Sequence, residues 1–67
     1  MNISQIIKDR RLQLELTQQD LADYTELSLH IIKSIEAGKG NPTFSTLNKI
    51  SEILGLEIIM QVKEVNK

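Results

Sequence analysis

The stretch LTQQDLADYTELSLHIIKSIEAGKGNP, residues 16–42, carries the signals of two short helices joined by a tight turn. Thr17 is followed three residues later by Asp20, a capping-box variant in which the hydroxyl and the carboxylate both serve the first turn of a helix. This pair predicts a helix over residues 18–24. The letters TEL that follow are the turn. The turn either folds a small helical bundle or aims the second helix at a ligand.

The second helix of this stretch begins after Ser28, whose hydroxyl can cap the first amides. Ile32 and Ile35 lie one turn apart and predict an inward-facing stripe. Gly38 follows, and glycine tolerates the left-handed backbone that commonly ends a helix. A helix over residues 29–37 is therefore expected.

The same kinds of signal flank this stretch on both sides. Asn2 with Gln5 three residues later is a capping pair that predicts a first helix over residues 4–13. Thr43 can cap a fourth helix, whose apolar residues repeat at three- and four-residue steps until Gly55. The chain is thus expected to be mainly α.

The pattern changes after the fourth helix, where apolar and polar residues begin to alternate with a period of two. Such alternation is typical of a half-buried strand. We expect residues 1–67 to be a single domain, with a helical core over 1–55 and a strand over 56–65. No second strand-like segment exists in the sequence, so the strand is expected to pair with another copy across a two-fold axis. Ile58, Met60 and Val62 would then lie in the dimer interface.

Composition restricts the function more than it identifies it. The chain has 67 residues, no cysteine, one histidine and a formal net charge of −1. These counts argue against thiolate zinc sites, His clusters and a nucleophile–base set, so neither an enzyme nor a bound metal or cofactor is expected. The longest apolar runs are short and no signal-peptide pattern is present, so a soluble cytoplasmic protein without membrane contact is the expectation. The net charge alone argues mildly against a nucleic-acid partner.

Residues 3–58 resemble the helix-turn-helix domains of the phage lambda repressor and Cro type, the XRE-like regulators. The resemblance rests on features that occur together and in order: Arg11, LTQQDLA, the serine that opens the third helix, IEAGKGNP, and the spaced Leu, Ile and LG of the fourth helix. It implies a lambda-repressor-like domain of four to five helices that binds a roughly palindromic operator in double-stranded DNA as a homodimer. The helix after Ser28 would enter the major groove.

The resemblance also implies roles for individual residues. The positions that match DNA-contacting residues of the family are Gln18, Ser28, Leu29, His30, Lys33, Ser34, Lys39, Asn41 and Thr43. Arg11 and Glu36 match a partly buried ion pair between the first and third helices. Other interpretations remain open: Gln18 and His30 as ordinary surface residues, and Leu29 as helix packing or a protein contact. Glu26 departs from the family pattern, which usually has glycine in the turn.

Three functions remain after this comparison. The first is a sequence-specific transcriptional repressor. The second is an antitoxin of the Hip type, in which the C-terminal strand pairs across the dimer and the protein binds a kinase-like toxin as well as DNA. The third is a protein-interaction module that has kept the fold and lost DNA binding, an interpretation motivated by the negative net charge and by Glu26.

Overall fold

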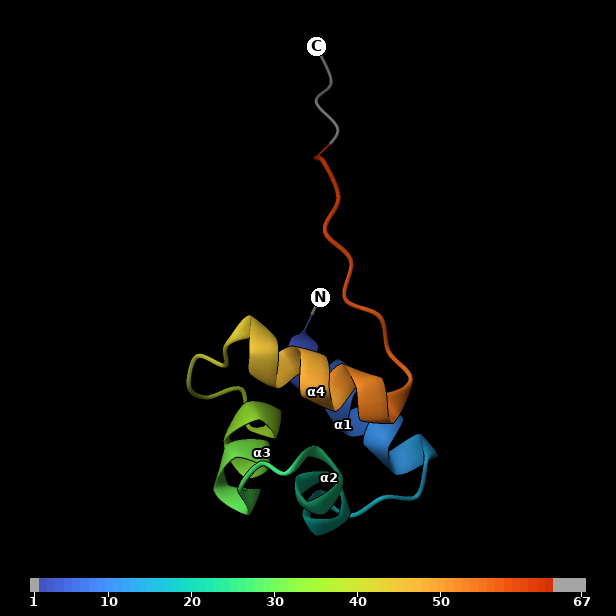
Figure 1. Ribbon diagram of the computed structural model, residues 1–67, viewed down its shortest axis with the longest axis vertical. Coiled ribbons are helices and arrows are strands. Elements are labelled where there is room, and N and C mark those ends of the chain that lie inside the picture. The colour runs from blue at the N-terminus through green and yellow to red at the C-terminus, as the bar shows by residue number, and fades with distance from the viewer. Residues whose placement is uncertain (1, 64–67) are drawn as a thin grey trace.

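The computed structural model describes residues 2–63, and these contain four helices. They are α1 (Ile3–Gln13), α2 (Gln18–Thr25), α3 (Leu29–Glu36) and α4 (Phe44–Leu54). Figure 1 shows α1 and α4 packed together, with α2 and α3 beneath them and the C-terminal tail leading away from the bundle. The four helices predicted from the sequence are confirmed, and their predicted first and last residues differ from the observed ones by at most one.

The helices begin where the sequence places their caps. Thr17 and Asp20 form the complete capping box, because the Thr17 Oγ1 accepts from the Asp20 N–H and the Asp20 carboxylate accepts from the Thr17 N–H, each at 2.9 Å. Asn2 caps α1, but its expected partner does not reciprocate: the Gln5 side chain donates instead to Asp9, at 2.7 Å. The Asp9 carboxylate lies four residues further along α1, on the same face of the helix as Gln5, and so is within reach of that amide.

A compact apolar core joins all four helices. Its buried members are Ile7, Leu21, Ala22, Ile32, Ile35, Ile50 and Leu54. The inward stripe of α3 is therefore present as predicted. On α4 the pattern is only partly right, since Ile53 is exposed and Ser51 is buried in its place. Ile53 lies at the edge of the apolar face of α4 and is 37% exposed, whereas Leu54 is fully buried.

The turn between α2 and α3 adopts left-handed backbone at a residue that is not glycine. Glu26 has φ 60° and ψ 27°. This conformation is uncommon for residues with a Cβ atom, which is the consequence expected where the family usually has glycine. The turn keeps its geometry because the Leu27 N–H donates to the Ala22 carbonyl at 3.1 Å, closing the end of α2.

The tail after α4 forms no strand within the described residues. Leu56 packs against the core, and its N–H donates to the Ser51 carbonyl at 2.9 Å. Beyond it the chain leads away from the bundle without a neighbour to pair with (Figure 1). The sequence predicts the strand only as half of an intermolecular pair, and a single chain offers no second half. Residues 64 and 65 of the predicted strand lie outside the described residues.

Candidate nucleic-acid interface

The solvent side of α3 is set by the side that faces the core. Because Ile32 and Ile35 face the core, the opposite side of α3 faces solvent, and His30 and Lys33 on that side are exposed. The first turn is fixed by Ser28, whose Oγ accepts from the Ile31 N–H at 3.1 Å. The orientation of α3 is thus fixed by its N-terminal cap and by the packing of its buried side.

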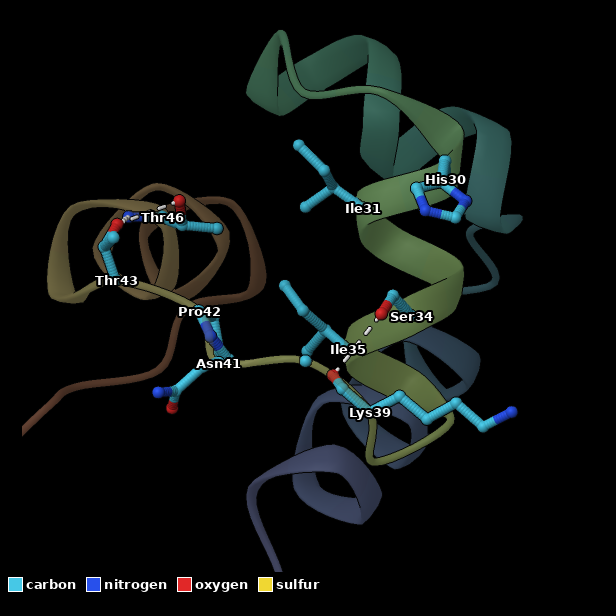
Figure 2. Close-up of a pocket in the computed structure, with 10 residues that line it drawn as sticks. His30, Ile31, Ser34, Ile35, Lys39, Asn41, Pro42, Thr43 and Thr46 are labelled. Carbon is cyan, nitrogen blue, oxygen red and sulfur yellow. Dashed lines mark hydrogen bonds between the residues drawn. The ribbon is translucent and has the colours of Figure 1, made fainter.

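A shallow hollow of about 310 Å³ lies between α3, the loop that follows it and the start of α4. It brings together five of the residues predicted to contact DNA: His30, Ser34, Lys39, Asn41 and Thr43 (Figure 2). His30 and Ser34 belong to α3, Lys39 and Asn41 belong to the loop, and Thr43 is the N-cap of α4. These five predicted contacts therefore lie around one hollow, whereas the other four, Gln18, Ser28, Leu29 and Lys33, do not line it.

The loop after α3 is tied back onto the helix through Ser34. The Lys39 N–H donates to the Ser34 carbonyl at 2.9 Å, and the Ser34 hydroxyl contacts the Lys39 carbonyl at 3.4 Å. Gly40 has φ 77°, and a Cβ atom added there would lie 3.2 Å from the Ser34 hydroxyl. The hydroxyl predicted to read bases is therefore partly engaged in shaping the loop. Lys39 is left on the outside, where its ammonium group is exposed.

Arg11 and Glu36 form an ion pair between α1 and α3. The Arg11 Nε donates to Glu36 Oε2 at 2.7 Å and a terminal nitrogen donates to Glu36 Oε1 at 2.9 Å, with the two side chains 8% and 3% exposed. The other terminal nitrogen donates to the Leu16 carbonyl at 2.7 Å. Hydrogen bonds to Glu36 and its charge raise the pKa of Arg11 above its ordinary value, although burial acts in the opposite direction. Arg11 is therefore charged and bidentate to Glu36, and each of its three side-chain nitrogens donates one hydrogen bond.

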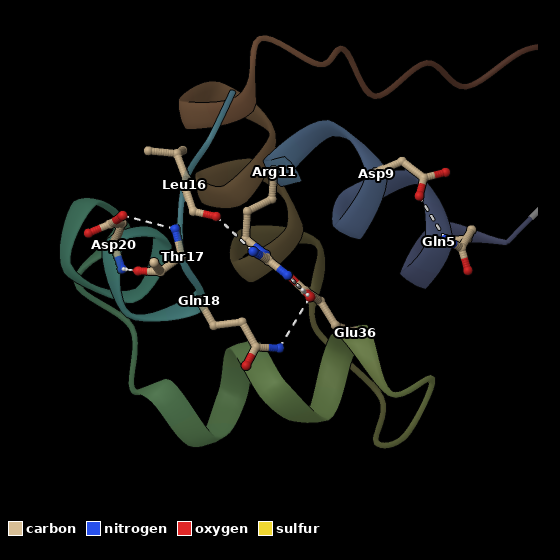
Figure 3. Close-up of polar contacts among 8 residues, drawn as sticks. All are labelled: Gln5, Asp9, Arg11, Leu16, Thr17, Gln18, Asp20 and Glu36. Carbon is tan, nitrogen blue, oxygen red and sulfur yellow. Dashed lines mark hydrogen bonds and ion pairs between the residues drawn. The ribbon is translucent and has the colours of Figure 1, made fainter. Parts of the chain in front are cut away.

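Gln18 joins this pair from the N-terminus of α2. Its Nε2 donates to Glu36 Oε1 at 3.2 Å, and the residue is half-buried (Figure 3). Gln18 is thus more than a solvated surface amide. The sequence predicted a phosphate contact for Gln18 and an ion pair between Arg11 and Glu36. It did not predict that Gln18 and Arg11 both donate to Glu36 Oε1. Sequence separation hides the contact, since α2 and the end of α3 meet only through the fold.

Leu29 lies differently from the other residues predicted on the α3 face. It is half-buried and packs against the core cluster, which favours the helix-packing interpretation for most of its side chain. Ile31, its neighbour but one, is exposed at the edge of the hollow. The exposed face of α3 therefore includes fewer of the residues predicted to contact DNA than the family resemblance implied.

The local charge of this surface differs from that of the whole chain. Between residues 28 and 46 the sequence has Lys33 and Lys39, both exposed, and a single carboxylate. That carboxylate is Glu36, which is buried and neutralised by Arg11. The surface formed by α3 and its loop is therefore cationic although the chain as a whole is at −1. A surface of this kind suits polyanions.

The residues predicted for the dimer interface lie elsewhere. Ile58 is 42% exposed and lines an apolar groove with α1 and α4, whereas Met60 and Val62 are 96% and 97% exposed. The groove is separate from the α3 hollow, since the two share no lining residue. A ligand in the α3 hollow would therefore not block a partner that covered the tail.

Residues 2–63 contain neither a candidate metal site nor a candidate membrane span. No group of three His, Asp or Glu side chains lies close enough together there to hold a metal ion. None of the four helices in that range has the length and apolar character needed to span a membrane.

Comparison with known proteins agrees with the fold. The family model described as Helix-turn-helix matches residues 7–59. The chain is similar to the immunity repressor protein of Bacillus phage phi105, at 36% identity over 96% of this chain and 44% of the repressor. It is also similar to multiprotein-bridging factor 1 of Debaryomyces hansenii, at 33% identity over 87% of this chain and 39% of that protein. The chain therefore spans less than half the length of these relatives. The chain belongs to the XRE-type helix-turn-helix family.

Proposed function

We propose that the chain is a sequence-specific, DNA-binding transcriptional regulator that acts as a repressor. The observation that carries the proposal is the cationic surface of α3 and its loop, where two lysines are exposed and the single carboxylate is buried. Membership of the helix-turn-helix family supports it, as does similarity to a phage immunity repressor. In this proposal α3 enters the major groove, which is wide enough to admit a helix.

Phosphate contacts are proposed at two places that meet near the end of α3. One is the first turn of α2, where the amides of Gln18 and Gln19 precede the first intrahelical hydrogen bond, made by the Leu21 N–H. Such amides and the helix dipole favour an anion. The other is the loop after α3, which offers the exposed ammonium of Lys39. Because Gln18 touches Glu36, the last residue of α3, the two places flank the same end of the recognition helix.

Base recognition is proposed for the outward positions of α3. The exposed imidazole of His30 can hydrogen-bond base edges, and Lys33 can reach a guanine or a phosphate. Ser28 and Ser34 have structural duties in the cap and the loop, and Leu29 packs inward, so each offers less to DNA. Few direct base contacts imply modest discrimination from a single chain.

A dimer would provide the missing discrimination by reading two half-sites. We propose that residues 57–65 of two copies pair as antiparallel strands across a two-fold axis. Met60 and Val62 support this, because both are almost wholly exposed and follow Ile58 at two-residue steps, the spacing that would place all three on one side of a strand. The pairing would cover this apolar surface and fix the separation of the two recognition helices. The dimer is proposed to act in the cytoplasm without a cofactor and without enzymatic activity.

Selection from duplexes that contain a randomised central region tests the proposal. The expected result is enrichment of a two-fold symmetric sequence, followed by tight binding of the enriched duplex in fluorescence anisotropy. Affinity for this duplex should fall steeply as salt rises. Failure of the chain to bind any duplex at low salt would contradict the proposal.

A second candidate is a role in binding proteins. Two observations favour it: the exposed apolar tail, and similarity to a protein named as a multiprotein-bridging factor. The antitoxin interpretation belongs here, with a kinase-like toxin as the protein partner and DNA as the other. Co-purification of the chain with the product of the adjacent gene would support an antitoxin, whereas tight operator binding by the chain alone supports a free-standing regulator.

A further inference from the structure

We infer that Glu36 is a positioning residue for DNA binding: it holds the Gln18 side-chain amide in the orientation in which that amide donates to a DNA phosphate. The inference rests on the proposed function and concerns how one of its phosphate contacts is built. It goes beyond the structural role of the Arg11–Glu36 ion pair, because it gives the pair a direct effect on affinity.

The orientation of the Gln18 amide follows from the chemistry of its partner. A carboxylate engaged by arginine is ionised and can only accept hydrogen bonds, so the nitrogen of Gln18, not its oxygen, must face Glu36. One N–H of this nitrogen is then used at 3.2 Å. The second N–H of the same nitrogen remains as a donor at the edge of the ion pair. A free glutamine side chain would lose rotamer freedom when it bound an anion, and this one has lost it beforehand.

The same ion pair also fixes the backbone beneath this donor. Arg11 donates to the Leu16 carbonyl, and Leu16 immediately precedes Thr17, the N-cap of α2. Arg11 therefore holds the chain just before the first turn of α2, and Glu36 holds the side chain of the first residue within it (Figure 3). Glu36 is also the last residue of α3, three residues before Lys39. One buried pair thus sets the α2 terminus and the α3 loop relative to each other.

A neighbouring glutamine provides a matched control. Gln19 is also in the first turn of α2, but its Nε2 donates to Asp23 on the same helix, at 2.8 Å, and has no contact with the ion pair. Any effect of Glu36 that is transmitted through the first turn in general would appear at both glutamines. An effect transmitted by the side-chain contact appears at Gln18 alone.

The test is a double-mutant cycle in DNA affinity. Gln18→Ala is measured in the parent chain and in a chain with Arg11→Met and Glu36→Leu, which removes both buried charges together and so avoids leaving one unpaired. The probe is a labelled mixed-sequence duplex about two helical turns long, at low salt, because a phosphate contact does not require the operator. A second background, Glu36→Asp, keeps both charges and withdraws the carboxylate from Gln18, and it serves if the first background does not fold.

We expect Gln18→Ala to weaken binding by about two- to tenfold in the parent, the range of one hydrogen bond, and to have no effect in either altered background. The salt dependence should not change, because glutamine carries no charge. Gln19→Ala should have the same effect in every background. If Gln18→Ala costs the same factor with and without Glu36, the positioning role is overturned while DNA binding stands. If the parent chain does not bind the duplex, the proposed function fails and this role fails with it.

Discussion

The helical core of residues 3–54 and the tail of residues 56–63 differ in how much of their chemistry is satisfied within one chain. In the part of the chain that the structure describes, every buried side-chain nitrogen and oxygen has a hydrogen-bond partner. In the tail, Met60 and Val62 expose nearly all of their apolar surface. The core is complete in a single copy, whereas the tail has the alternating pattern of a half-buried strand and, beyond Leu56, leaves its apolar side chains exposed. The difference indicates where a partner is needed.

The largest effect on stability is expected from breaking the buried Arg11–Glu36 ion pair. Glu36→Ala would leave Arg11 buried without a counter-charge, because both side chains are almost inaccessible to solvent. Removing one partner of such a pair typically costs about 3 to 5 kcal/mol. Urea denaturation followed by circular dichroism measures this change in the free energy of unfolding. Glu52→Ala, which removes an exposed acid of α4, is the control and should change stability by less than about 0.5 kcal/mol.

Removing the tail is expected to have the next largest effect, on assembly and not on folding. Because Leu56 packs against the core, the chain should be ended after this residue. The shortened chain should keep its helical circular dichroism and become monomeric in light scattering. Loss of the second half-site contact should weaken operator binding by about a hundredfold or more. A shortened chain that remains a dimer with unchanged affinity would show that the tail has no role in assembly.

The exposed side of α3 also lacks a partner in the single chain. Substitution of His30 tests whether this side of α3 recognises the base sequence of DNA. His30→Ala should change the ranking of operator variants by about 1 to 3 kcal/mol at one or two base pairs, since a base-edge hydrogen bond is lost. Selection on randomised duplexes, carried out in parallel with parent and variant, measures this. Identical preferences would mean that His30 is an ordinary exposed side chain.

Lys39 tests the sequence-independent part of the same face. Lys39→Ala should weaken binding to different duplexes about equally and reduce the magnitude of the salt slope by about one unit, because one phosphate contact is lost. Lys49→Ala is the matched control, since Lys49 is an exposed lysine of α4 that does not line the α3 hollow. Titrations at several salt concentrations measure both slopes. Equal slopes for the two variants would remove Lys39 from the interface.

Contacts between residues close in sequence could be predicted, whereas contacts between distant helices could not. Caps such as Thr17 with Asp20 depend on residues three positions apart, so the sequence contains all of the information they need. The Arg11–Glu36 pair was expected only because the sequence resembles a known family, since 25 residues separate its members. The Gln18 contact to Glu36 was missed for the same reason, as no local pattern encodes a hydrogen bond between two helices. The sequence left Leu29 open between a DNA contact and helix packing, and only the fold shows that it packs against the core. The apolar repeat of the fourth helix includes Ile53, but periodicity does not give the depth of burial, and Ile53 is partly exposed.

The smallest effect is expected at the turn before α3, where the core retains local strain. Glu26 has φ 60°, and left-handed backbone costs a residue with a Cβ atom about 1 to 2 kcal/mol, whereas glycine adopts it freely. Glycine also gives the unfolded chain more freedom, which offsets about 0.5 to 1 kcal/mol of the gain. Glu26→Gly should therefore stabilise the fold by up to about 1 kcal/mol in urea denaturation.

A charge-matched variant separates backbone strain from electrostatics at this turn. Glu26→Gln removes the carboxylate and keeps the Cβ atom, so it should leave stability unchanged, while both variants should bind DNA more tightly at low salt through reduced repulsion of phosphate. Glu15→Gly is the second control, because Glu15 has φ 57° in the turn after α1 and should gain stability by the same mechanism. If Glu26→Gly lowers stability instead, contacts of the Glu26 side chain outweigh the strain. The turn would then be adapted to glutamate rather than merely tolerating it.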